Sequence, residues 1–269
     1  MGDQQFRAAV CQIQTELDRA RTMEKAQNMV RVAAENGAQV VCLPEMFNCP
    51  YSGKYFKKFA AEGHEDSVRE MASWARENQI VLIGGSVPET EEGRLYNTCF
   101  VFNEKGEQIA RHRKVHLFDV DIQESNTFTP GKDITVFDTK YGRFGVAVCF
   151  DVRFPELFRA MAKRGARMIF LPAQFNGKTG PAHWELSLRM RAVDNEVFFA
   201  GAAAARHVGF SYECWGHSMF VDPFGRVIAA CEEKEQILYA DIDLGQTDVI
   251  RAQLPTFNCL REDVYPVAK

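Results

Sequence analysis

A cysteine, a glutamate and a lysine each follow a strand-like run, and these three residue types together can perform acyl transfer. Cys149 follows the apolar run 144–148 and precedes Pro155-Glu156, a proline and an acid that are typical of a helix start. A thiol at such a bend can point into the crevice at the carboxyl end of the strand. Because the thiolate is the nucleophile, Cys149 becomes reactive when a base or a cation lies nearby. Taken alone, a buried structural cysteine is the alternative interpretation.

Glu45 and Lys114 can supply that base and that cation. Glu45 comes directly after the buried run Val40–Leu43, where burial would raise the pKa of its carboxyl toward the range of a general base. Lys114, at the end of a predicted hairpin, can favour a thiolate and hold the oxyanion of acyl transfer. Glu124, in the polar loop 119–132, is a second candidate acid. Each of these three residues, taken alone, could instead be an ordinary solvent-exposed charged residue. The hypothesis therefore depends on their order along the chain.

The elements that must position these residues alternate between strand and helix. Short apolar runs of the kind found in buried strands include 6–13, 40–43, 80–87, 144–148, 168–171 and 197–204. Helical spacing of apolar residues predicts helices over 17–37, 55–61, 67–78, 155–165, 180–196 and 243–253. Two hairpins are predicted, over 95–116 with a turn at 103–106 and over 217–240 with a turn at 222–225.

The second half of the chain repeats the plan of the first half. The segment LPEMFN at 43–48 recurs as LPAQFN at 171–176, each after a buried strand. FVFNEKGEQIA at 100–110 matches MFVDPFGRVIA at 219–229 in its apolar positions and its turn glycine. Two α/β halves supply two sheets that can pack face to face with helices outside. We therefore predict one domain over residues 1–269, a four-layer α-β-β-α sandwich.

Composition excludes several classes of function. The net charge of −4 has both signs interspersed, so no basic surface for nucleic acid is expected. No apolar run reaches the length that spans a membrane, and the first residues lack the apolar stretch of a signal peptide. The eight cysteines form no C-x-x-C pair and the histidines form no metal motif, so reduced cysteines, a cytoplasmic location and no metal are expected.

Three motifs in order resemble the nitrilase superfamily of carbon–nitrogen hydrolases. They are LPEMF with Glu45, RHRKVHLFD with Lys114 and GVAVCFDVRFPEL with Cys149. The resemblance implies an α-β-β-α sandwich that pairs as a homodimer, and catalysis without a metal or an organic cofactor. It also implies that Glu45 is the general base, Lys114 the cation for the tetrahedral intermediate and Cys149 the nucleophile. Glu124 matches an additional acid that is often found beside that triad.

Within the superfamily, the omega-amidase (Nit2-like) branch is the most similar. The motifs that support this branch include LPEMFNCPYSGKYF, FNGKTGPAHWEL, RAVDN and SYECWGHS. The branch implies hydrolysis of the terminal amide of 2-oxoglutaramate or 2-oxosuccinamate through a cysteine thioester. The Nit1-like branch, which cleaves deaminated glutathione, is the alternative, and a catalytically silent partner protein on this fold is a third.

The substrate pocket is predicted from residues near the two LP segments. A 2-oxo acid amide needs cationic or hydroxyl groups for its far carboxylate. Candidate binding groups are the backbone N–H of Phe150 for the oxyanion and the side chains of Tyr51, Asn176, Lys178 and Thr179. Arg153 follows the cysteine motif, and a structural ion pair is its alternative role. The short loop 119–132 borders this pocket, and the sequence leaves open which amide substrate is preferred.

Overall fold

The computed structural model describes residues 4–62, 64–120, 122, 124–210 and 212–265, and the statements that follow concern these residues. Asp121 and Gln123 of the predicted loop 119–132, and Ser211 of the motif SYECWGHS, lie outside the described residues. In the described part of the chain, no helix combines the length and the apolar character needed to cross a membrane.

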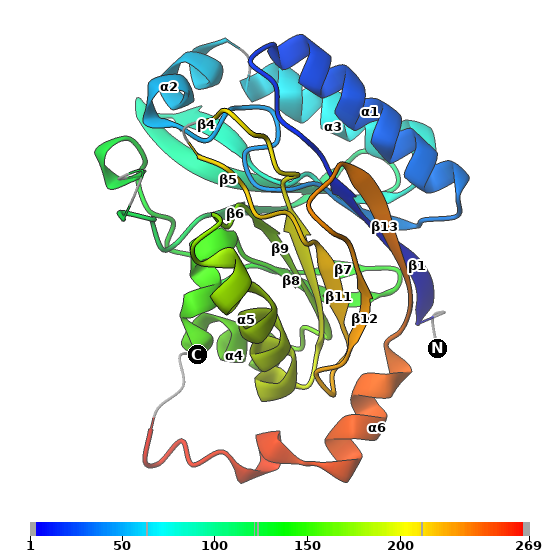
Figure 1. Ribbon diagram of the computed structural model, residues 1–269. Helices are drawn as coiled ribbons and strands as arrows, with labels where there is room; N and C mark the ends of the chain where they lie inside the picture. Colours follow the sequence, from blue (N-terminus) through cyan, green and yellow to red (C-terminus); the bar gives the residue numbers. More distant parts are fainter. Residues whose placement is uncertain (1–3, 63, 121, 123, 211, 266–269) are drawn as a thin grey trace.

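Two sheets form the centre of the molecule (Figure 1). The first sheet has the order β13-β1-β2-β3-β5-β4, with β6 paired to β5. Its strands are β1 (Gln5–Gln12), β2 (Val40–Cys42), β3 (Val81–Ile83), β4 (Val87–Glu91), β5 (Arg94–Phe102), β6 (Gln108–Arg113) and β13 (Gln236–Asp243). The second sheet has the order β12-β11-β10-β9-β8-β7. Its strands are β7 (Val136–Thr139), β8 (Gly142–Val146), β9 (Met168–Ala173), β10 (Phe198–Ala203), β11 (Met219–Val221) and β12 (Val227–Ala230).

Each sheet contains three neighbouring parallel strands, β1-β2-β3 in one and β8-β9-β10 in the other. The segment LPEMFN follows the middle strand β2, and LPAQFN spans the end of the middle strand β9, which includes Leu171, Pro172 and Ala173. The two LP segments therefore occupy equivalent places in the two halves. This arrangement confirms the predicted repeat.

Helices cover the outer faces of both sheets and complete the four layers (Figure 1). Apolar side chains of α1 and α3 pack on the first sheet, and α4 and α5 lie over the second. The helices are α1 (Arg19–Glu35), α2 (Gly53–Ala61), α3 (His64–Asn78), α4 (Pro155–Lys163), α5 (Gly180–Asn195) and α6 (Gly245–Gln253), with 3₁₀ turns η1 (Glu124–Asn126), η2 (Cys149–Arg153) and η3 (Thr256–Cys259). Between the sheets, Val10 and Cys42 belong to the same buried core as Val146 and Phe170. The predicted α-β-β-α sandwich is confirmed.

The structure differs from the predicted strands at three places. The run 80–87 is not one strand, because β3 ends at Ile83 and β4 begins at Val87. Gly85 lies between them with φ +62°, and a side chain there would come 2.2 Å from the carbonyl oxygen of Pro44. The predicted hairpin 217–240 is correct only for β11 and β12, because β13 crosses to pair antiparallel with β1 in the first sheet. Strand β7, which pairs with β8, was not predicted.

Candidate active site

Cys149 begins the 3₁₀ turn η2, directly beyond the end of β8. Its φ of +45° is in the left-handed region, which is unusual for a residue with a side chain and recurs at functional sites. The thiol is buried, and its Sγ donates to the carbonyl oxygen of Gln174 at 3.6 Å. The predicted bend therefore exists and directs the thiol to the crevice between the strand ends.

Glu45 lies on the other side of that crevice, beyond the end of β2, and is fully buried. Its Oε1 accepts from Lys114 Nζ at 2.9 Å and from Asn97 Nδ2 at 2.8 Å. Its Oε2 accepts from the backbone N–H of Gln174 at 3.0 Å. Burial raises the pKa of Glu45, and the charge of Glu124 adds to this effect, although Lys114 opposes it.

Lys114 follows β6 and has oxygen partners on three sides. Its ammonium donates to Glu45 Oε1 at 2.9 Å, to Glu124 Oε2 at 2.7 Å and to the Tyr51 hydroxyl at 3.4 Å. Burial by itself would lower the pKa of Lys114, but the charges of Glu124 and Glu45 raise it well above its usual value. Lys114 is therefore held as a cation, and the neutral Tyr51 is its weakest partner.

Glu124 lies in the short turn η1, inside the polar loop that was predicted to border the pocket. It is fully buried, and its Oε2 accepts from the backbone N–H of Phe118 at 2.8 Å. Its Oε1 accepts from Asn97 Nδ2 at 3.3 Å, so Asn97 bridges the two carboxylates. The structure thus brings Glu45, Lys114 and Glu124 into one buried cluster beside Cys149.

Burial and the charges of the cluster both act on the pKa of the Cys149 thiol. Burial raises the pKa of the Cys149 thiol well above its usual value, and the charge of Glu45 adds to that rise, while Lys114 lowers it. The thiol and the Glu45 carboxylate each act on the pKa of the other. A neutral thiol next to a carboxylate of raised pKa is the arrangement from which general-base activation of a cysteine begins.

Asp151 holds the bend at Cys149 through hydrogen bonds. The sequence analysis did not identify this residue. Its Oδ2 accepts from the backbone N–H of Val148 at 3.0 Å and lies 3.1 Å from His112 Nε2. Its Oδ1 lies 2.7 Å from His116 Nδ1 and accepts from the His116 N–H at 2.9 Å. The signal in the sequence was the pair of histidines that flank Lys114. Through Asp151, the segment that carries Lys114 is tied to the turn that carries Cys149.

Gln174 was also missed, although it occupies the position of Met46 in the repeated LP segments. Its side-chain Nε2 donates to the carbonyl oxygen of Glu45 at 2.7 Å, and its Oε1 accepts from Cys214 Sγ at 3.0 Å. Its carbonyl oxygen accepts from both Cys149 and the Tyr212 hydroxyl, the latter at 2.8 Å. Gln174 therefore links the general-base candidate of one sheet to the nucleophile candidate of the other.

A narrow cavity opens beside Cys149. It holds about 10 Å³, roughly the space of one water molecule. It is lined by Phe118, Cys149, Phe150, Arg153, Gln174, Phe175, Thr179 and Tyr212. Of the predicted binding residues, Phe150 and Thr179 lie at this cavity, and Tyr51 lies behind the cluster against Lys114.

Arg153 is the cation at the mouth of this cavity. Its guanidinium lies over the rings of Phe150 and Phe175, with distances of 5.7 and 5.3 Å to the ring centroids. Both terminal nitrogens lie 3.4 Å from His183 Nδ1. Among the residues that the structure describes, no carboxylate pairs with Arg153, so the ion pair considered from the sequence is not present there.

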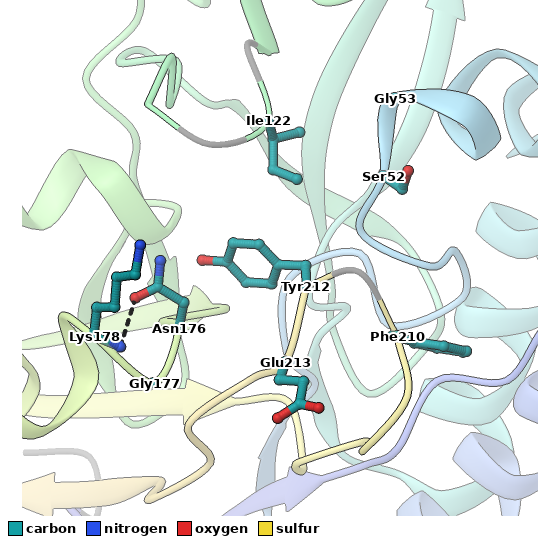
Figure 2. A pocket seen from close by; sticks show the side chains of 9 residues that line it. All are labelled: Ser52, Gly53, Ile122, Asn176, Gly177, Lys178, Phe210, Tyr212 and Glu213. Carbon is teal, nitrogen blue, oxygen red and sulfur yellow. Dashed lines mark hydrogen bonds between the residues drawn. The ribbon is translucent and has the colours of Figure 1, made fainter.

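Asn176 and Lys178 line a separate, larger cavity of about 690 Å³ (Figure 2). Ser52, Gly53, Ile122, Gly177, Phe210, Tyr212 and Glu213 complete its lining. Asn176 Oδ1 accepts from the backbone N–H groups of Lys178 and Thr179 and from the Thr179 hydroxyl, and these bonds shape the turn before α5. The predicted binding residues thus divide between the two cavities.

Within the described residues, no group of three or more His, Cys, Asp or Glu side chains is arranged to hold a metal ion. The cluster itself carries two carboxylates around one ammonium. Its chemistry is therefore that of a buried acid, base and thiol.

Two facing sheets with a buried Glu-Lys cluster and a thiol at their strand ends are the setting in which the comparisons with known proteins apply. The family model of the carbon-nitrogen hydrolases matches residues 7–252, and the chain belongs to this family. The omega-amidase NIT2 of Bos taurus is 45% identical over 97% of each chain.

Two solved structures are similar to this fold. Nit3 of Saccharomyces cerevisiae, a member of branch 10 of the nitrilase superfamily, is 39% identical with a TM-score of 0.89, covering 94% of this chain and 96% of that chain. The NitFhit protein of C. elegans is 33% identical with a TM-score of 0.93, covering 98% of this chain and 67% of that chain.

Proposed function

We propose that this enzyme is an omega-amidase, which hydrolyses the terminal amide of 2-oxoglutaramate and 2-oxosuccinamate to the 2-oxo dicarboxylate and ammonia. The observation that carries the proposal is the buried thiol of Cys149 facing the Glu45–Lys114–Glu124 cluster. The similarity to proteins named omega-amidase in cattle, human and mouse supports the choice of substrate.

The reaction begins with proton transfer from the Cys149 thiol to Glu45, whose raised pKa suits a general base. The sulfur attacks the amide carbon, and a tetrahedral intermediate with one oxyanion forms. Glu45 returns the proton to the leaving nitrogen, the C–N bond breaks and ammonia departs, leaving a thioester. A water molecule, deprotonated by Glu45, then attacks the thioester and releases the acid and the thiol.

The oxyanion is stabilised by Lys114 and by the backbone N–H of Phe150. Two protons of the Lys114 ammonium are held by carboxylates at 2.9 and 2.7 Å. The third faces the Tyr51 hydroxyl at the longer distance of 3.4 Å, so Tyr51 is the partner that an oxyanion can replace.

The far carboxylate of the substrate is anchored by Arg153. This guanidinium lines the same cavity as Cys149, as does Thr179, which directly precedes the first turn of α5. A helix N-terminus and an arginine both favour an anion. Lys178 is exposed in the outer cavity and contributes a longer-range positive charge together with the amide of Asn176.

The test compares ammonia release from 2-oxoglutaramate with cleavage of deaminated glutathione by the purified enzyme. We expect a higher kcat/KM for 2-oxoglutaramate, because one charge-assisted contact made to a compact substrate is worth about tenfold or more. A higher kcat/KM for deaminated glutathione would replace the omega-amidase assignment with the Nit1-like alternative. Absence of turnover on either amide would contradict the hydrolase chemistry itself.

The proposal includes a homodimer in the cytoplasm. Leu186, Met190 and Val193 are exposed on α5, and Phe224 is exposed on the neighbouring β11–β12 turn. Contiguous apolar side chains on a surface favour contact with a second copy of the chain. The eight cysteines are all free, which suits a reducing compartment. Analytical ultracentrifugation of the wild type and of Met190→Glu tests the dimer, and cell fractionation tests the location.

A further inference from the structure

Tyr212 lies between the narrow cavity at Cys149 and the two larger cavities outside it. It lines the cavity of about 10 Å³ beside Cys149, and it also lines the outer cavity of about 690 Å³. A third cavity of about 400 Å³, which Tyr51 and Phe210 also line, borders the same ring. Figure 2 shows the ring of Tyr212 projecting toward Asn176 across the outer cavity. Among the described residues that line these cavities, Tyr212 is common to all three.

Several contacts hold the Tyr212 ring in this position. It is only 7% exposed, and its hydroxyl donates to the carbonyl oxygen of Gln174 at 2.8 Å. The Cys149 thiol donates to the same carbonyl oxygen, so Tyr212 and Cys149 share one hydrogen-bond acceptor. On its other side it packs edge-on against Tyr51, with ring centroids 4.9 Å apart. These contacts therefore hold the Tyr212 ring in one position beside the Cys149 thiol.

The residues that line the Cys149 cavity differ in exposure. Phe118, Phe150, Arg153 and Thr179 are half-buried. Tyr212 is buried and lines both this cavity and the outer cavity, so its ring lies between the two spaces. A short acyl group that ends in a carboxylate can project over Arg153 and Thr179, whereas a longer acyl chain needs the space behind Tyr212.

We infer that Tyr212 is the specificity-determining residue that limits the acyl-chain length of the amide. This inference rests on the proposed amide hydrolysis and adds a size limit to it. Removing the ring joins the small cavity to the larger one, and each methylene that leaves water then favours binding by about fourfold. The hydroxyl of Tyr212 fixes the ring, and the bulk of the ring sets the limit.

The experiment measures kcat/KM for butanamide and octanamide, which differ only in chain length and carry no carboxylate. Tyr212→Ala is expected to raise the octanamide-to-butanamide ratio about tenfold or more over wild type. Tyr212→Phe keeps the ring and is expected to leave that ratio within about twofold. Phe210→Ala is the matched control, because Phe210 lines the outer cavities but not the cavity at Cys149, and its ratio is also expected to stay within that range.

Tyr212→Leu provides a second, better-packed variant if the alanine variant unfolds, and it should move the ratio in the same direction. Intact folding is checked by Tm and by the rate at which iodoacetamide alkylates Cys149. An unchanged ratio in a folded Tyr212→Ala or Tyr212→Leu variant overturns the inference, as does an equal shift in Phe210→Ala. Wild-type turnover of 2-oxoglutaramate is measured in parallel, so a failure of the proposed function is seen separately.

Discussion

The ammonium of Lys114 lies 2.9 Å from the carboxylate of Glu45, although one follows β6 and the other follows β2. Both side chains are fully shielded from solvent, and Glu124 lies on the far side of the ammonium at 2.7 Å. Two carboxylates and one ammonium give the cluster a net negative charge while Cys149 is neutral. In the proposed mechanism, proton transfer from the thiol to Glu45 leaves the number of negative charges unchanged, so that step would separate no new charge.

Cys149→Ala should abolish ammonia release from every amide and leave the protein folded. The change removes one buried sulfur, so it creates little empty space and should lower Tm only slightly. Ammonia release is measured with 2-oxoglutaramate, and folding is measured by Tm. Turnover by the folded variant would show that Cys149 is not the nucleophile.

Lys114→Met should reduce turnover by about a hundredfold to a thousandfold, because it removes an oxyanion partner. It also leaves Glu45 and Glu124 buried without their cation, and breaking a buried ion pair costs about 3–5 kcal/mol of stability. The kcat and the free energy of unfolding are measured together. A variant within about threefold of the wild-type kcat, set against that range, would mean that another cation holds the oxyanion.

The acid limb of the kcat/KM profile should lie above pH 4.5, the ordinary pKa of a glutamate, because burial and Glu124 raise the pKa of Glu45. The base works when deprotonated, so activity falls as the pH falls through this raised pKa. Glu124→Gln removes a like charge and should move the limb to lower pH. The profile of 2-oxoglutaramate hydrolysis is the measurement, and a limb that stays in place would show that Glu124 does not act on Glu45.

Arg153→Met should raise KM for 2-oxoglutaramate by about tenfold or more and change KM for butanamide little, since only the former has a far carboxylate. Thr179→Val should act in the same direction with a smaller effect. Lys178→Ala should have a weaker effect still, because Lys178 is exposed in the outer cavity and absent from the lining of the cavity at Cys149. A larger effect of Lys178→Ala than of Arg153→Met would reverse this assignment.

Asp151→Asn should destabilise the fold at neutral pH and less so in acid. Burial raises the pKa of Asp151, but hydrogen bonds from His112 and His116 lower it more, so it falls well below 3.8. A carboxyl with a depressed pKa stabilises the folded state above its unfolded pKa, and this contribution is lost as pH falls through the folded value. Urea unfolding of both proteins should therefore show a difference of about 1–3 kcal/mol at pH 7 that narrows below pH 3.8. A difference in the free energy of unfolding that does not change with pH would contradict this link between Asp151 ionisation and stability.

Glu45, Lys114 and Cys149 could be predicted because each follows a strand-like run and the three motifs occur in the order of the family. Apolar runs define strand ends, and polar residues just past those ends must lie at the edge of a sheet. The repeated LP segments indicated which strands are equivalent, and the structure places them at the ends of β2 and β9. These patterns depend only on residues that are close together in the sequence, so they can be recognised without a structure.

Other parts of the molecule depended on contacts between distant segments. The pairing of β13 with β1 joins the last strand to the first, and no local pattern marks it. The sequence left Arg153 between a binding role and a structural ion pair, and the structure shows aromatic rings and His183 around its guanidinium.

The roles of Gln174 and Tyr212 likewise come only from the meeting of the two sheets, where one carbonyl oxygen faces both Cys149 and Tyr212. Sequence alone determined which chemical groups stand at strand ends, because the period of apolar residues is local. Only the tertiary structure decided which of these groups share one crevice, because that depends on how the two sheets pack face to face.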